Sequence, residues 1–284
     1  MNDKLSIFLL VVKNMNFSRT AEELFMTQPA VSQYVKNLEE ELGVQLFDRS
    51  HKQIQLTKAG EIVAYYGKEI DTLSQSMKRK LDDLTSHVGG DLLLGASYSY
   101  GEYLLPKRLA AFLDVYPQVV PSICIANTAE IAEKIVDQTL DLGIIEGTVN
   151  NKWIESHKIA TDHLVVVAKS GQPVHNLDAH TWIIREEGSG TREAFDNFKK
   201  EHRLNPTHTM VFGSTQLIKE AVANGLGLAL LSEWTIQDEI HLNKLQIIRR
   251  EDFHYQRDFH AIHLNTPFLT KTTDTFLDYL KRNK

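Results

Sequence analysis

The chain has 284 residues, 42% of them hydrophobic and 24% charged, which is the composition of a soluble globular protein with more than one compact unit. Its formal net charge of −6 argues against a protein that coats nucleic acid through bulk positive charge. No run of about 18 apolar residues is present, so no membrane-spanning helix is expected, and the single cysteine, Cys124, excludes an internal disulfide and favours the cytoplasm.

Two short helices are expected near the N-terminus. Apolar residues at helical spacing predict a first helix that ends near Asn14, and Ser18 is a good N-cap for the second. The inner face of the second helix is expected to hold three apolar residues, Ala21, Leu24 and Phe25.

The third helix exposes an unusual surface. Thr27 can cap it, and its buried stripe is expected to consist of Val31, Val35, Leu38 and Leu42. The other side carries Gln28, Pro29, Ser32, Gln33 and Lys36. These compact hydrogen-bonding side chains and a single cation can approach base edges in a major groove, so the helix pair predicts a helix-turn-helix. Amphipathic helix pairs without DNA contacts are also common.

Two short strands, 45–47 and 54–56, are expected next, around a polar turn. They would form a wing in which Arg49 and Lys52 could reach DNA phosphates, with an ordinary solvated loop as the alternative. Residues 1–58 contain equal numbers of basic and acidic side chains, and most of the acidic excess lies in residues 89–284. Any nucleic-acid contact is therefore expected in the N-terminal part.

A long helix is expected over residues 58–88, with Thr57 as its cap. Thirty residues of helix extend about 45 Å, and a near-heptad spacing of apolar residues suits a dimerising coiled coil. The expected seam consists of Tyr66, Ile70, Leu73, Met77, Leu81, Leu84 and Val88.

Residues 17–60, "FSRTAEELFMTQPAVSQYVKNLEEELGVQLFDRSHKQIQLTKAG", resemble the N-terminal signature of LysR-type transcriptional regulators. The segments "TQPAVSQ", "LEEELGVQLF" and "LTKAG" carry the resemblance. It implies that the outer side of the third helix faces the operator, and many relatives have an arginine where Tyr34 stands or in the wing, which leaves the base preference open. The expected DNA contacts are Ser18, Thr27, Gln28, Pro29, Ser32, Gln33, Lys36, Arg49 and Lys52.

Strand and helix patterns alternate from residue 91 onward, which predicts an α/β fold with parallel sheets covered by helices. Strands are expected at 92–96, 119–126, 142–146, 163–169, 182–186, 210–212, 228–231, 245–249 and 258–264, and helices at 104–115, after 128, 190 and 214, and at 270–282. The resemblance implies a two-lobed effector domain like that of periplasmic solute-binding proteins.

The expected domains are a winged helix-turn-helix (1–58), a linker helix (59–88) and an effector-binding domain (89–284). Its first lobe would comprise about 91–161 and 266–284, and its second about 162–265. The chain would then cross between the lobes near Asp162 and return near Asn265.

Nearly every strand in the C-terminal part ends in a hydroxyl or amide side chain, where open α/β sheets bind ligands. The segment "GSGTR" (188–192) can present N–H groups to a small anion at a helix start, although a plain helix cap formed by Gly190 and Glu193 is the alternative. The candidate effector contacts are Ser97, Tyr98, Ser99, Asn127, Thr128, Glu146, Ser189, Gly190, Thr191 and Thr215.

Catalytic, cofactor-binding and metal motifs are not apparent. Ser189 lacks the G-x-S-x-G arrangement, and no glycine-rich nucleotide motif occurs. His260 and His263 would lie on opposite faces of a strand, without a cysteine or carboxylate partner. We therefore expect a dimeric or tetrameric promoter-binding regulator that responds to a small metabolite. The alternative is a solute-binding or catalytic α/β protein whose N-terminal helices only oligomerise it.

Overall fold

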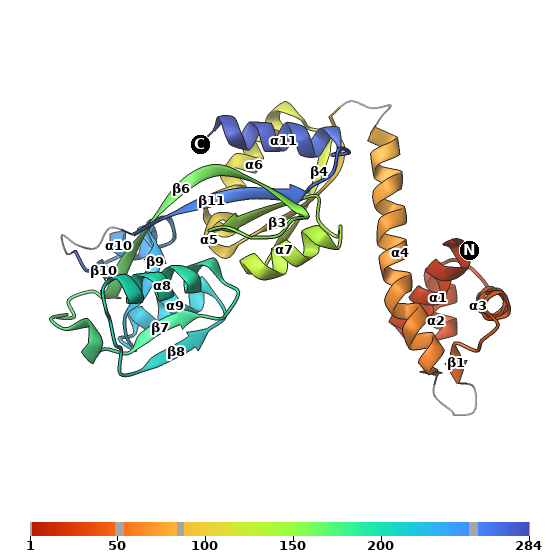
Figure 1. Ribbon diagram of the computed structural model, residues 1–284, viewed down its shortest axis with the longest axis horizontal. Coiled ribbons are helices and arrows are strands. Elements are labelled where there is room, and N and C mark those ends of the chain that lie inside the picture. The colour runs from red at the N-terminus through yellow and green to blue at the C-terminus, as the bar shows by residue number, and fades with distance from the viewer. Residues whose placement is uncertain (1, 49–53, 84–87, 250–254, 284) are drawn as a thin grey trace. The chain divides into compact units, whose positions relative to one another are not determined.

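The computed structural model describes residues 2–48, 54–83, 88–249 and 255–283, which form two compact units, Met1–Leu81 and Asp82–Lys284 (Figure 1). Each unit is described by itself. Among the described residues, no helix combines the length and the apolar character that crossing a membrane requires.

The first unit is a three-helix core with a two-stranded wing and a long helix. Its elements are α1 (Asn2–Asn14), α2 (Phe17–Glu23), α3 (Gln28–Leu42), β1 (Phe47–Asp48), β2 (Gln55–Leu56) and α4 (Lys58–Asp83). Phe8 of α1, Val31 and Val35 of α3, and Phe47 of the wing are packed in one core. The predicted winged helix-turn-helix is therefore present.

Three details of this unit differ from the sequence prediction. The cap of α2 is Asn16, whose side chain accepts a hydrogen bond from the N–H of Arg19, so the helix begins before Ser18. Phe25 is 99% exposed rather than buried, because α2 has already ended and the backbone turns at Phe25 with a φ of 53°. Leu42 is also exposed, because it is the last residue of α3 before Gly43 adopts a left-handed conformation.

The wing is joined to α3 by Glu39. The Oε1 atom of Glu39 accepts hydrogen bonds from the backbone N–H groups of Leu46 (2.8 Å) and Phe47 (3.3 Å). The strands are one or two residues long in excess of a single bridge and pair Phe47 with Leu56. Arg49 and Lys52, the predicted phosphate contacts, lie outside the described residues.

Thr57 caps α4 as predicted, since its hydroxyl accepts a hydrogen bond from the N–H of Gly60 (3.0 Å). The helix is described to Asp83, and Leu84 lies outside the described residues. Val88 does not belong to the seam, because it packs against the core of the second unit. The exposed apolar side chains of α4 include Tyr66, Ile70, Leu73, Met77 and Leu81.

The second unit is an α/β structure. Its first elements are β3 (Gly90–Ala96), α5 (Tyr98–Tyr103), α6 (Leu105–Val115), β4 (Val119–Ile125), α7 (Thr128–Val136), β5 (Leu142–Glu146) and β6 (Ile154–Lys169). They are followed by η1 (Leu177–Ala179), β7 (Trp182–Arg185), α8 (Gly190–Glu201), β8 (Thr209–Phe212), α9 (Thr215–Ala223) and β9 (Ala229–Ser232). The last are η2 (Glu233–Thr235), α10 (Gln237–His241), β10 (Leu245–Ile247), β11 (Tyr255–Leu264) and α11 (Lys271–Arg282).

Two long antiparallel strands, β6 and β11, run from one lobe to the other (Figure 1). In the first lobe the sheet order is β6-β11-β5-β3-β4, with β3 parallel to β4 and β5. In the second lobe β6 pairs with β9 and β10, while β7 pairs in parallel with β8. The predicted two-lobed α/β fold is therefore confirmed, with antiparallel strands added at its middle.

The lobe connections differ in detail from the prediction. β11 pairs with β5 from Phe259 to Ile262, so the chain is already back in the first lobe before Asn265. The helix expected from Leu104 onward is split there into α5 and α6. Separate apolar cores lie under α6 and α11 in the first lobe and under α8 in the second.

Candidate functional site

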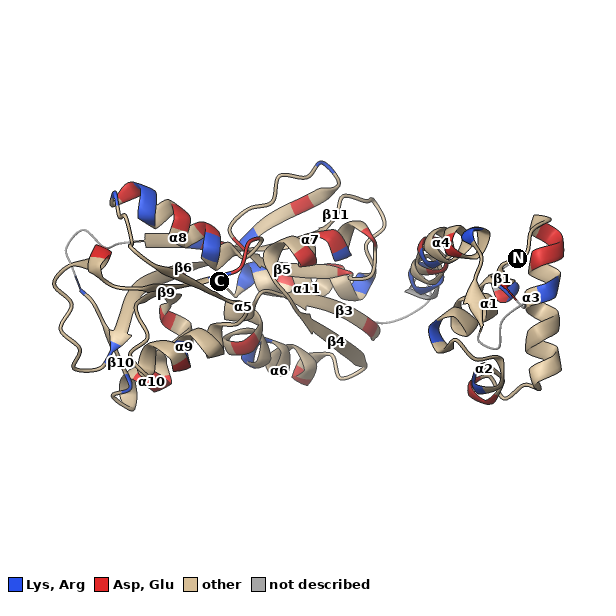
Figure 2. Cartoon of the chain, turned by 90° about the horizontal axis from the view of Figure 1, so that it is seen from below, with Lys and Arg blue, Asp and Glu red and all other residues tan. Residues whose placement is uncertain are grey.

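The outer side of α3 is polar and open to solvent. Gln28, Pro29, Gln33 and Lys36 are exposed and Ser32 is partly exposed, opposite the buried Val31, Val35 and Leu38 stripe. Ser18 and Thr27 are exposed on α2 and at the start of α3, where Thr27 makes no side-chain cap bond. Figure 2 shows that the charged residues of α3 gather towards one end of the helix.

These polar side chains are paired only with one another. The Gln28 amide donates to the Ser32 hydroxyl (2.8 Å), and the Gln33 amide donates to the Asn37 side-chain oxygen (2.7 Å). Both bonds are solvent-exposed contacts within a single helix, so they cost little to exchange for base edges. The arrangement can therefore offer donors and acceptors to a major groove.

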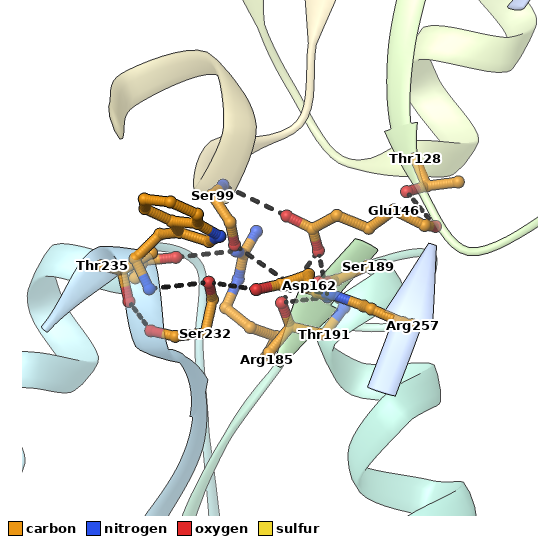
Figure 3. A network of polar contacts seen from close by, with 12 residues as sticks. Ser99, Thr128, Glu146, Asp162, Arg185, Ser189, Thr191, Ser232, Thr235 and Arg257 are labelled. Carbon is orange, nitrogen blue, oxygen red and sulfur yellow. Dashed lines mark hydrogen bonds and ion pairs between the residues drawn. The ribbon is translucent and has the colours of Figure 1, made fainter. Parts of the chain in front are cut away.

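A buried ionic network joins the two lobes, with Arg257 of β11 at its centre (Figure 3). The guanidinium donates to Asp162 (2.8 Å), Glu146 (2.6 Å), Thr191 (2.9 Å) and Ser99 (3.1 Å). Ser99 and Glu146 belong to the first lobe and Thr191 to the second, and Arg257 is only 8% exposed. Breaking this network would leave charges buried without partners.

The two carboxyl groups beside Arg257 respond differently to burial. Burial opposes ionisation of Glu146, but the Arg257 guanidinium and hydrogen bonds from Ser99 and Thr191 outweigh it and lower the pKa of Glu146. For Asp162 burial wins over the attraction of Arg257, and its pKa is raised. Glu146 is therefore the firmer negative partner of Arg257, while the Ser232 hydroxyl donates to Asp162 (2.6 Å).

The predicted effector residues on α7 and α8 meet Glu146. The Thr191 hydroxyl donates to the Glu146 carboxylate (2.9 Å), and the Thr128 hydroxyl donates to the Glu146 carbonyl oxygen (3.2 Å). A Cβ on Gly190 would lie 2.5 Å from that same carbonyl oxygen, so glycine permits the close approach of the lobes. These hydroxyls therefore already have protein partners.

The helix caps at these positions are shifted by one residue from the prediction. Ser189, not Gly190, caps α8, because its side chain accepts a hydrogen bond from the N–H of Thr191. Asn127, not Thr128, caps α7 by accepting from the N–H of Glu130. In both helices the following residue has helical geometry already, which leaves its hydroxyl free for contacts between the lobes.

Ser97 and Arg185 are the two groups of this region that could still turn to a ligand. Ser97 is 2% exposed, and among the described residues its hydroxyl finds no hydrogen-bond partner. Arg185, at the end of β7, is also 2% exposed and donates to both oxygens of Glu186 (2.7 Å each). Its guanidinium lies 4.3 Å from the ring centre of Tyr98 and 3.5 Å from the Thr215 hydroxyl.

Sequence reasoning missed Arg185, Arg257 and Asp162. The available signal was a cation or carboxylate inside a strand pattern, as in "WIIRE" and "QRDFH", where a buried charge requires a partner. Arg192, which the sequence grouped with the anion site, pairs instead with Asp196 (3.0 Å) on the exposed side of α8.

A cavity of about 400 Å³ lies beside the network. It shares Gly190 and Arg257 with the network, and its lining includes Lys158, Asn197 and His260. The region between the lobes therefore combines a polar cavity, buried cations and the beginnings of α7 and α8. Such convergent polar groups are typical of a small-molecule site.

The expectation that His263 has no carboxylate partner is wrong. Glu155 and His157 lie beside it, and one ligand atom from each of the three residues lies within 4.8 Å of the others. His157 and His263 are 106 residues apart in the chain. That separation is why the spacing of histidines in the sequence did not reveal the group.

Two family descriptions match this chain. Residues 2–61 match "Bacterial regulatory helix-turn-helix protein, lysR family", and residues 85–284 match "LysR substrate binding domain". The chain is 32% identical to the HTH-type transcriptional regulator CysL of Bacillus subtilis, over 99% of this chain and 97% of that protein.

Solved structures also resemble it. The regulatory domain of CcmR from Synechocystis PCC6803, in complex with 2-PG, is 28% identical, covering 68% of this chain and 96% of that chain, with a TM-score of 0.62. Full-length CbnR, complexed with its target DNA, is 20% identical over the whole of both chains with a TM-score of 0.76, which shows a shared fold.

Proposed function

Because the chain belongs to the LysR family of bacterial transcriptional regulators, we propose that it binds promoter DNA through α3 and responds to a small anion held between the lobes of its second unit. Its relatives are named transcriptional regulators, and we propose the same role here rather than catalysis. The observation that carries the proposal is the pairing of an open, compact polar face on α3 with a buried polar site between two lobes.

The DNA contacts that we propose are the exposed residues of α3 and its surroundings. Gln28, Ser32 and Gln33 offer amide and hydroxyl groups of the kind that pair with base edges, and Lys36 offers one cation near the backbone. Self-association would come from the exposed apolar side chains of α4, because a two-fold dimer places two such helices on successive half-sites.

Replacing Gln33 with alanine is expected to reduce discrimination between a selected operator duplex and random DNA by about five-fold to a hundred-fold, since a base contact contributes about 1–3 kcal/mol. Fluorescence anisotropy with the full-length protein at fixed salt measures both affinities. The matched control is Gln75→Ala on α4, because Gln75 is also exposed and donates to Asp71 within its helix (2.8 Å). Equal selectivity of the two variants would contradict the assignment of this face.

The anion site that we propose lies around Ser97, Ser99, Thr128, Ser189 and Thr191, close to Arg185. Arg257 is held by two buried carboxyls, whereas the partner of Arg185 is the 28% exposed side chain of Glu186. Glu186 can turn towards solvent at little cost, which would free a buried guanidinium for a carboxylate or phosphate. The complex of CcmR with 2-PG supports a small anion of this kind.

The variant Arg185→Gln is expected to weaken anion binding about ten-fold to a hundred-fold, because a hydrogen bond to a charged group contributes about 1.5–3 kcal/mol. A thermal-shift titration of the full-length protein with 2-PG, inorganic phosphate, sulfate and small carboxylates measures the response. Arg192→Gln serves as the control, since its partner Asp196 is on the exposed side of α8. The anion site is refuted when wild type responds to none of these anions, or when Arg185→Gln responds as wild type does.

A further inference from the structure

A second cluster of polar side chains lies in the first lobe, on the sheet face that packs against α11. β6 and β11 are antiparallel there, with Glu155 opposite His263 and His157 opposite Ala261. Side chains alternate along a strand, so Glu155, His157 and His263 share the face of Ala261, which belongs to the core that includes α11. The cluster is separate from the network around Arg257.

The ligand atoms of the three side chains converge on one point. His157 Nε2 lies 3.1 Å from His263 Nε2 and 3.3 Å from Glu155 Oε1, and His263 Nε2 lies 4.0 Å from Glu155 Oε2. Two ligand atoms that share one ion at about 2.0–2.1 Å, with roughly 90–110° between them, lie about 3.0–3.4 Å apart. The two shorter separations have this value already.

His263 is oriented as a metal ligand would be. It is 3% exposed, and its Nδ1 atom lies 2.9 Å from the carbonyl oxygen of Leu264. A carbonyl only accepts hydrogen bonds, so Nδ1 carries the proton and Nε2 presents its lone pair to His157. A ligating histidine in proteins almost always has such a second partner, which fixes the ring and its tautomer.

We propose that Glu155, His157 and His263 bind a divalent first-row metal ion of the zinc class, with water completing the coordination. Two imidazoles and one carboxylate form a donor set that suits zinc and its neighbours rather than calcium or magnesium, which take oxygen ligands. The charged α11 side chains that act on His157, Asp278 and Lys281, cancel each other. Glu155 therefore leaves the cluster with a net negative charge that favours a cation.

Such an ion would join β6 to β11 at the end of the sheet. The same two strands carry Asp162 and Arg257 further along, so the ion would fix the strand pair that reaches the interlobe network. Without an ion, His157 Nε2 would donate its proton to His263 Nε2, which is a single neutral hydrogen bond at a partly exposed position. The two arrangements predict different responses to metal.

Zinc titration of the full-length protein tests the site, with any affinity tag removed and bound metal stripped beforehand. Competition against a chromophoric chelator is expected to show one high-affinity equivalent of Zn²⁺ in wild type. His157→Gln and Glu155→Gln should each weaken that binding at least about ten-fold to a hundred-fold, the loss typical of even an outer partner of a metal site. Zn²⁺ should raise the Tm of wild type and leave the Tm of these variants unchanged.

His163→Gln is the matched control, because His163 is exposed on the same strand and outside the cluster. It should bind Zn²⁺ as wild type does. His157 and Glu155 are more exposed than His263, so their variants keep the test valid if His263→Gln fails to fold. The proposal is overturned if wild type and His157→Gln bind Zn²⁺ equally, or if His163→Gln loses as much affinity as the cluster variants.

Discussion

Replacing Arg257 with methionine is expected to lower the free energy of unfolding of the second unit by about 3–5 kcal/mol, because removal of one partner leaves buried charge uncompensated. The Glu146 carboxylate, 2% exposed, would lose the cation that lies 2.6 Å away. Methionine restores most of the apolar volume, so the loss reports the charge and its hydrogen bonds rather than a cavity.

Urea unfolding followed by tryptophan fluorescence measures this loss for one unit alone. All three tryptophans, Trp153, Trp182 and Trp234, lie in the second unit. The control is Lys158→Met, whose ion pair with Asp258 (2.7 Å) is about half exposed and should contribute only about 0–1 kcal/mol. Adding Glu146→Gln to Arg257→Met should recover part of the stability, since it removes the stranded charge. Equal losses for Arg257→Met and Lys158→Met would contradict the role given to the network.

Placing aspartate at both Leu73 and Leu81 of α4 is expected to raise the dissociation constant of the dimer by a factor of about a thousand or more. Two helices that pack along this face must desolvate the new carboxylates, and burying an unpaired charge costs several kcal/mol. Both leucines are exposed in the single chain, so the folded unit should tolerate the change. A monomer would engage one half-site only and would bind the operator weakly.

Sedimentation velocity across a range of protein concentrations measures this shift. The control is the pair Lys68→Asp and Gln75→Asp, which adds charge at exposed positions of α4 that lie away from the proposed seam. Circular dichroism checks that both proteins keep their helix content. A Leu73→Asp, Leu81→Asp protein that still sediments as a stable dimer would show that subunits meet through another surface.

The first unit could be predicted from local sequence because its periodicity and its caps agree with its packing. Val31, Val35 and Leu38 repeat at helical spacing and are buried, and Thr57 caps α4. The errors fall where a helix ends. Phe25 has helical spacing with Ala21, but the chain leaves the helix before it reaches Phe25, and periodicity alone does not locate that point.

The site between the lobes was only partly predictable. Parallel strands place their carboxyl ends together, so the hydroxyls of Ser99, Thr128 and Thr191 could be expected near one another. Arg257 could not be assigned in this way, because its partners Glu146 and Asp162 are about a hundred residues away in the chain. The first half of β6, "IESHKIATD", was missed for a related reason, since a sheet-edge strand with one solvated face lacks the apolar run of a buried strand.

The central claim is that this chain reads DNA sequence, and selection from a random pool of duplexes tests it most directly. The full-length protein, at fixed salt near physiological strength, should enrich a motif with two related half-sites spaced by about one helical turn or a multiple of it. The enriched duplex should compete at least about a thousand-fold better than random DNA of equal length. A pool with no enriched sequence after repeated rounds, or an enriched duplex that competes no better than random DNA, would contradict the account.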